Sequence, residues 1–116
     1  MKFTANLKGR LKILNSKVLA LLGFACKAGK LSFGMNEAKW ALEKGKSKLI
    51  VVACDVSEKS QKEIRFFSSN KDIKVLTLES ISIKTVSEAV GRNCGIISVN
   101  DSGFADGILG GYANDQ

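Results

Sequence analysis

Residues that could recognise a nucleic acid recur on one side of a predicted helix that runs from residue 35 to residue 44. At about 100° per residue, Met35, Ala38 and Leu42 fall within about 60° of one another and form the expected core face. An amide, a carboxylate, an indole and an ammonium lie away from that face: Asn36, Glu37, Trp40 and Lys44. An aromatic ring beside such groups can stack on a base while its neighbours bind the base edges.

The start of this helix adds to the candidate site. Gly34 and the free backbone N–H groups of the first helical turn suit a phosphate. Glu37 repels phosphates, so on a basic surface it is either ion-paired or an acceptor for the protons of a base. Asn-Glu at a helix start is also ordinary capping chemistry. Trp40 could equally pack against a neighbouring segment such as the N-terminal arm, or anchor a protein partner.

Positive charge is concentrated in the first part of the chain. The 116 residues carry a net charge of +7. Residues 1–48 hold 11 Lys and Arg against two acidic residues, a balance of +9, whereas residues 49–116 hold 7 against 9, a balance of −2. Such an asymmetry favours a polyanionic partner, most often a nucleic acid, although a charged face can also serve solubility alone.

The composition argues against most catalytic and metal sites. The chain contains no His, which removes the commonest general base, the commonest metal ligand and any Ser-His or Cys-His nucleophile pair. Cys26, Cys54 and Cys94 form no CxxC pair, so we expect reduced, mostly buried thiols in a cytoplasmic protein and no zinc site. Neither a P-loop nor a GxGxxG motif is present. We therefore expect no metal and no cofactor.

Helical and extended patterns alternate along the chain. Helices are predicted to begin after the cap residues Ser16, Ser57 and Ser82, from about residue 35, and at Asp101 or Ser102. They are predicted to end near Gly29, Lys44, Phe67, Gly91 and Leu109. Extended segments are predicted over residues 30–33, 48–54, 73–78 and 95–99. This alternation predicts a three-layer α/β/α sandwich around a small, mixed, four-stranded sheet.

Two parts of the chain are distinguished by this pattern. Residues 1–15 are expected to form a basic N-terminal lead-in, and residues 16–116 a single α/β/α domain. The run Leu49–Ala53 is continuously apolar, as in a strand covered on both faces, and is far too short to cross a bilayer. The N-terminus lacks the continuous apolar core of a signal peptide. We expect a monomer without a membrane partner.

Four segments carry a recognisable pattern. Residues 34–45 read GMNEAKWALEKG, residues 48–55 read KLIVVACD, residues 21–31 read LLGFACKAGKL and residues 86–91 read VSEAVG. Together they resemble the kink-turn-binding ribosomal proteins of the L-seven-Ae and L-thirty-e superfamily, with the third segment similar to its bacterial YlxQ branch. The resemblance spans roughly residues 17–110.

The resemblance implies an α/β/α sandwich that binds a sharply bent RNA helix–bulge–helix. It gives Asn36 and Glu37 the reading of guanines in tandem sheared G·A pairs. It gives Gly34 a contact with the RNA backbone, and Lys44 the role of a basic residue one turn below the motif. The partner it implies is structured RNA, either a kink-turn or ribosomal RNA.

The same resemblance implies a second contact region. An irregular loop after the Ala-x-Gly motif cradles an extruded bulge base in the family, and that loop corresponds here to Arg92, Asn93 and Cys94. The chain departs from the family where a Lys is usual, because Trp40 stands there and Lys39 precedes it. Helix geometry points Lys39 more toward the core than Trp40, so Lys39 is not a simple replacement.

Three classes of function remain in competition. The leading hypothesis is a non-catalytic RNA-binding protein of the ribosomal kind. A small α/β nucleotide-binding enzyme is the second, with Asp55 at the end of a predicted strand as its carboxylate. We interpret Asp55 instead as turn and capping chemistry before the third predicted helix. A protein-interaction module anchored by Trp40 is the third.

Overall fold

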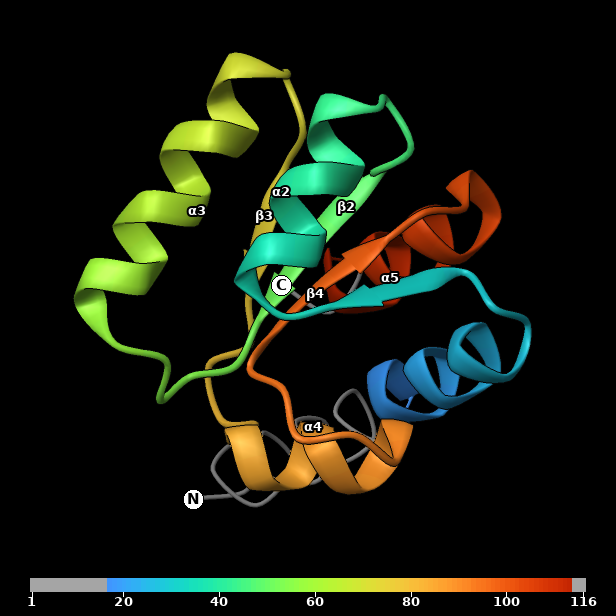
Figure 1. Ribbon diagram of the computed structural model, residues 1–116. Coiled ribbons are helices and arrows are strands. Elements are labelled where there is room, and N and C mark those ends of the chain that lie inside the picture. Colours follow the sequence, from blue (N-terminus) through green and yellow to red (C-terminus); the bar gives the residue numbers. More distant parts are fainter. Residues whose placement is uncertain (1–16, 114–116) are drawn as a thin grey trace.

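The computed structural model describes residues 17–113, which form one four-stranded sheet with helices on both of its faces (Figure 1). A first helix is described over residues 17–27. The elements that follow are β1 (Leu31–Phe33), α2 (Met35–Glu43), β2 (Leu49–Val52), α3 (Glu58–Asn70), β3 (Val75–Thr77), α4 (Ile83–Val90), β4 (Ile96–Val99) and α5 (Ser102–Ala113). The predicted lead-in over residues 1–15 and the predicted cap Ser16 lie outside the described residues.

The sheet has the order β1-β4-β2-β3 and is mixed, as predicted. β4 runs antiparallel to both β1 and β2, whereas β2 and β3 are parallel. Val99 therefore lies opposite Leu31 on one side and Leu49 on the other. The parallel pair requires a crossover, which α3 supplies.

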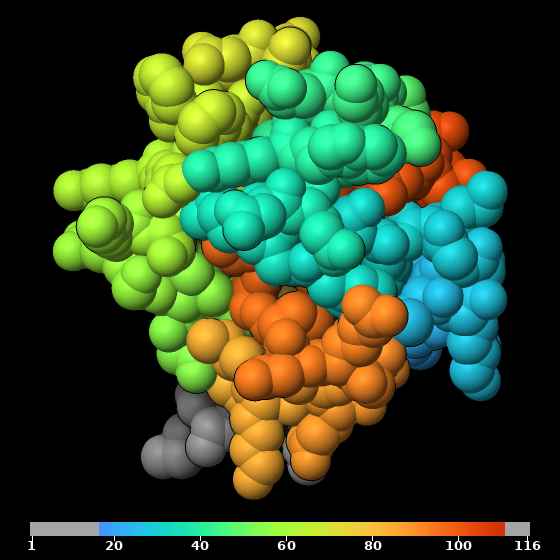
Figure 2. Space-filling model, viewed as in Figure 1, coloured from blue at the N-terminus to red at the C-terminus, as the bar shows by residue number. Residues whose placement is uncertain are grey.

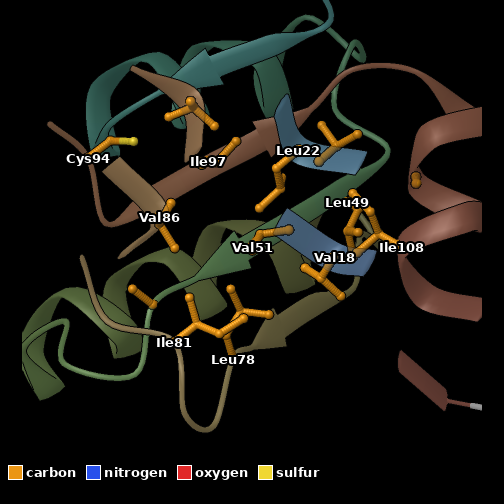
Figure 3. Close-up of a cluster of buried hydrophobic side chains, with 14 residues drawn as sticks. Val18, Leu22, Leu49, Val51, Leu78, Ile81, Val86, Cys94, Ile97 and Ile108 are labelled. Atoms are coloured by element: carbon orange, nitrogen blue, oxygen red, sulfur yellow. The ribbon is translucent and has the colours of Figure 1, made fainter. Parts of the chain in front are cut away.

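Alternation along the central strands divides the core between two layers. Leu49 and Val51 of β2 pack with the first helix, α4 and α5 on one face of the sheet (Figure 3). Ile50 and Val52 pack with α2 and α3 on the other face. Because all four residues are buried, β2 is covered on both sides, and the predicted three-layer sandwich is confirmed.

The helix boundaries follow from local chemistry. The hydroxyl oxygens of Ser57 and Ser82 accept from the backbone N–H of Ser60 and Thr85, which confirms both predicted caps. Asp101 accepts from the backbone N–H of Phe104 at 2.9 Å and begins α5. α3 runs to Asn70, three residues further than predicted, and the buried Ser68 hydroxyl in its last turn donates to the Ile64 carbonyl at 2.7 Å. No helix between residues 17 and 113 is both long and apolar enough to cross a membrane.

Candidate functional site

A glycine turn joins β1 to α2 and sets the direction in which the helix leaves the sheet. Gly34 has φ 88° and ψ 167°, a backbone region that is essentially restricted to glycine. Its N–H donates to the Ile96 carbonyl at 2.8 Å, and its own carbonyl accepts from the Ala38 N–H at 2.9 Å. The turn is thus fixed both to β4 and to the first turn of α2, and Asn36 and Glu37 stand exposed immediately after it.

The carboxylate of Glu37 has a structural contact as well as a free oxygen. Its Oε2 accepts from the backbone N–H of Phe33 at 3.0 Å. This is a variant of the capping box in which the third helical residue reaches back past the cap residue. Among residues 17–113, neither Oε1 of Glu37 nor the side-chain amide of Asn36 has a hydrogen-bond partner. Both groups are therefore available to a ligand while Glu37 still holds the turn.

The exposed face of α2 continues one turn further along the helix. Trp40 is 50% exposed, as the helical spacing predicts, and Lys46 Nζ lies 4.8 Å from the centre of its ring. Lys44 is exposed and makes no side-chain hydrogen bond or ion pair within the described part of the chain. Lys39 turns the other way, toward α3, where it pairs with Glu63 and lies 4.5 Å from the centre of the Phe67 ring. Lys39 therefore does not share the Trp40 face.

The loop between α4 and β4 lies against the glycine turn. The guanidinium of Arg92 stands 5.0 Å from the centre of the Phe33 ring, and Phe33 directly precedes Gly34. Asn93 is exposed beside it. In Figure 2, the teal atoms of β1 and α2 and the orange atoms of the α4–β4 segment form one continuous face of the molecule. Two segments that are far apart in the sequence thus share a surface.

Cys94 belongs to the core and not to that surface. Its side chain is 6% exposed and packs among the apolar residues under α4 (Figure 3). Its N–H donates to the Ser87 hydroxyl oxygen at 3.0 Å, and the same hydroxyl donates to the Cys94 carbonyl at 3.2 Å. Burial raises the pKa of the Cys94 thiol, the nearby Cys26 adds to the rise, and Arg92 opposes it. The buried Cys94 side chain therefore holds the loop from inside, and a part for this residue in RNA binding stays a prediction.

Two hollows flank the α4–β4 loop. One of about 530 Å³ runs along α4 beside Arg92 and Asn93. A second, of about 250 Å³, opens between Gly34, Ser57 and Gly95. An added Cβ at Gly95 would lie 2.8 Å from Val56 Cγ2 and 2.9 Å from Ile83 Cγ1, closer than such atoms approach, so no larger side chain fits there without a shift of its neighbours.

Sequence reasoning missed several residues that organise this surface. Asp55 is a capping residue, as expected, but its Oδ1 accepts from the Ile83 N–H at 2.8 Å and so caps α4 rather than α3. Phe33 and Lys46 were not singled out, although each forms half of a cation–aromatic pair. A usable signal existed, because Gly45-Lys46 and Gly91-Arg92 repeat one pattern after a helix. Within residues 17–113 no three His, Cys, Asp or Glu side chains come together as metal ligands.

Comparison with known sequences identifies relatives over most of the chain. An RNA-binding protein YlxQ from Enterococcus faecium is 29% identical over 89 residues, which cover 77% of this chain and 84% of that protein. A large ribosomal subunit protein eL30 from Methanospirillum hungatei is 34% identical over 89 residues, covering 71% of this chain and 84% of that protein. The names of these two relatives describe an RNA-binding protein and a ribosomal protein, and neither describes an enzyme.

Solved structures share the fold. A Bacillus halodurans protein of unknown function superposes with a TM-score of 0.78 at 24% identity, covering 86% of this chain and 98% of that one. A Giardia lamblia 15.5kD RNA binding protein gives a TM-score of 0.68 at 15% identity, covering 87% and 86%. The model of the ribosomal protein L7Ae/L30e/S12e/Gadd45 family matches residues 16–106. Because that model covers most of the chain, the chain belongs to the ribosomal protein L7Ae/L30e/S12e/Gadd45 family.

Proposed function

We propose that this chain is a cytoplasmic RNA-binding protein that recognises a kinked helix–bulge–helix with tandem sheared G·A pairs. Asn36 and the free Oε1 of Glu37 bind guanine edges, and the glycine turn at Gly34 meets the RNA backbone. Lys44 attracts phosphates further along α2. Arg92 and Asn93 border the hollow that receives the extruded base.

The contact between Arg92 and Phe33 is the observation that carries this proposal. It holds the α4–β4 loop against the start of α2, so the two regions that the family resemblance connects with RNA are neighbours. A bent RNA presents base edges and an extruded base at different angles, and such a target needs two adjacent contact regions. The names of the curated relatives support RNA as the partner.

The direct test compares three RNAs of equal length. One contains the kink with its G·A pairs, one replaces those pairs with G·C pairs, and one is a continuous duplex. We expect the kinked RNA to bind most tightly, and its affinity to fall steeply with salt because each contacted phosphate releases a counterion. Equal affinity for all three RNAs would indicate that the protein binds polyanions in general. A lack of affinity for any of them would favour the protein-interaction module.

A pair of charge-matched variants tests the role of Glu37. Glu37→Gln keeps an acceptor for the Phe33 N–H, so the turn persists, but it weakens acceptance of guanine protons. We expect a loss of about 1–3 kcal/mol for the kinked RNA, with non-specific binding unchanged or higher. Glu43→Gln removes the same charge from the other end of α2, where the exposed side chain has no partner in the described part of the chain. Equal gains in affinity from both variants would show that Glu37 only caps the helix.

A further inference from the structure

The indole of Trp40 is held by the way α2 ends. The Gly45 N–H donates to the Leu42 carbonyl at 3.2 Å, and the Lys46 N–H donates to the Ala41 carbonyl at 2.9 Å. This pair of bonds, with Gly45 at φ 70°, is the Schellman arrangement, which returns the chain over the last helical turn. Lys46 is carried back over Trp40, and its ammonium lies 4.8 Å from the ring centre. One face of the indole is therefore occupied and its orientation is restrained.

The remaining surface of Trp40 is open and lies in a cationic setting. Three large apolar side chains of the described residues are strongly exposed, Phe24, Trp40 and Phe66, and Trp40 alone of these three has a cation over its ring. Lys44 stands one turn along the same helix face, and Glu43 is the acidic neighbour at the adjoining spacing. An oriented, half-exposed indole beside two lysines suits a ligand that is both flat and anionic.

The position of Trp40 limits what part of an RNA could reach it. Trp40 is four residues beyond Asn36, a rise of about 6 Å along the helix axis. In a continuous duplex both faces of every base are covered by its neighbours, so only an unpaired or terminal base has a face to offer. We propose that Trp40, backed by Lys46, is a stacking site for one unpaired nucleotide that lies beside the sheared G·A pairs. This inference rests on the proposed function and adds a requirement on the target that the α2 start and the α4–β4 loop do not impose.

Intrinsic fluorescence gives a specific readout, because Trp40 is the single tryptophan of the chain. The probe is a kinked RNA in which each unpaired position, including a one-nucleotide overhang on either strand, is replaced in turn by an abasic residue. An abasic residue keeps the ribose and phosphate and removes only the base. We expect one position at which the replacement abolishes quenching of Trp40 and lowers affinity about tenfold or more, as expected for one stacked base.

A thermodynamic cycle assigns that loss to stacking. In Trp40→Ala the same abasic replacement should change affinity less than twofold, whereas Trp40→Phe should retain part of the effect. Phe66→Ala, which removes another exposed aromatic, should behave as wild type. Trp40→Lys should bind duplex RNA more tightly through its added charge, while its affinity for the kinked RNA no longer responds to the abasic position. Circular dichroism checks that each variant is folded.

The outcomes separate this inference from the proposed function. If wild-type protein prefers the kinked RNA but no abasic position is coupled to Trp40, the stacking site is wrong and the proposed function stands. If kinked and duplex RNAs bind equally, the proposed function fails. A short single-stranded RNA then decides on stacking, because quenching that an abasic residue removes would support the site, and its absence would reject it.

Discussion

Two turns of the molecule are built to the same local plan and differ in what they hold together. The α2–β2 turn and the α4–β4 turn each follow a helix with a left-handed glycine, Gly45 at φ 70° and Gly91 at φ 75°. In each turn the next residue is basic, and its cation lies about equally far from an aromatic ring, 4.8 Å for Lys46 and 5.0 Å for Arg92. A cation at this position also complements the carbonyl end of the helix.

The difference lies in the origin of the ring. Lys46 covers Trp40, which belongs to the helix that has just ended, so the α2–β2 unit is complete within seven residues of chain. Arg92 covers Phe33, which belongs to β1 and is far from Arg92 in the sequence. The same chemistry thus orients one side chain in the first turn and joins two segments in the second. A contact within one segment can orient a side chain on the surface. Only a contact between distant segments can bring the separate parts of a binding site together.

The largest difference between the turns is expected at the residue before each strand. Lys48 is exposed there in the α2–β2 turn, whereas Gly95 is packed against Val56 and Ile83 in the α4–β4 turn. Gly95→Ala should lower the free energy of unfolding by about 1–3 kcal/mol through overpacking. Urea denaturation measures the loss. Gly107→Ala is the matched control, because its new Cβ would meet Leu21 at an ordinary 3.6 Å, and an unchanged or higher stability is expected.

The second comparison is between the two left-handed glycines. Gly45→Ala and Gly91→Ala should each cost about 1–2 kcal/mol, because both positions have open space around them and only the backbone conformation is strained. Asparagine tolerates this conformation better, so Gly45→Asn and Gly91→Asn should recover part of the loss. Thermal denaturation measures all four. If alanine is harmless at either glycine, that turn does not depend on the left-handed conformation.

Removal of each cation tests the long-range role of Arg92. Lys46→Met and Arg92→Met should each lower stability by only about 0.5–1 kcal/mol, as for exposed cation–aromatic pairs. Their effects on RNA should diverge. Arg92→Met should reduce the preference for kinked over duplex RNA even when the nucleotide proposed to stack on Trp40 is abasic, whereas Lys46→Met should leave this remaining preference intact and lower affinity generally. Equal losses of preference in titrations with both RNAs would remove the distinction drawn between the two turns.

Alkaline pH should weaken the α4–β4 turn through the Cys94 thiol, and this loss of stability begins only above neutral pH. Burial raises the pKa of the Cys94 thiol above its unfolded value, so the folded state retains the proton longer than the unfolded state. This contribution is fully present below the unfolded thiol pKa of about 8.5 and is lost as pH rises above it. Urea midpoints between pH 7 and pH 10 should fall more in wild type than in Cys94→Ala, and parallel pH profiles would contradict the burial of the thiol.

The sequence predicted what depends on short spacings. The caps Ser57 and Ser82 act within three residues, and the exposure of Trp40 follows from helical periodicity, so these predictions are confirmed. The continuous apolar run of β2 sufficed to predict a strand between two layers. In each case the signal lies within a few residues of the feature that it predicts.

The features that were missed depend on contacts between distant segments. Cys94 follows Arg92 and Asn93 in an irregular loop, where no periodicity shows which side chain turns inward. Asp55 was expected to cap the next helix along the chain, but the sheet brings α4 closer to its carboxylate. The roles proposed for Asn36 and Glu37 in RNA binding stay predictions, because exposure and free hydrogen-bonding groups are conditions for that role and not evidence of contact.

The side chains of β2 alternate between the two faces of the sheet, and this has a consequence for folding stability. The consecutive residues Ile50 and Val51 pack in opposite core layers. A truncation of the Val51 side chain therefore disturbs one layer directly and leaves the packing of Ile50 in the other layer in place. The proposed RNA surface takes α2 from one layer and the α4–β4 loop from the other. A ligand that needs both layers docked stabilises the whole fold against partial opening, by about 2.7 kcal/mol at a concentration one hundred times its Kd. Bound RNA would then stabilise the layers on both faces of the sheet at once, and amides in both cores would exchange their hydrogens more slowly.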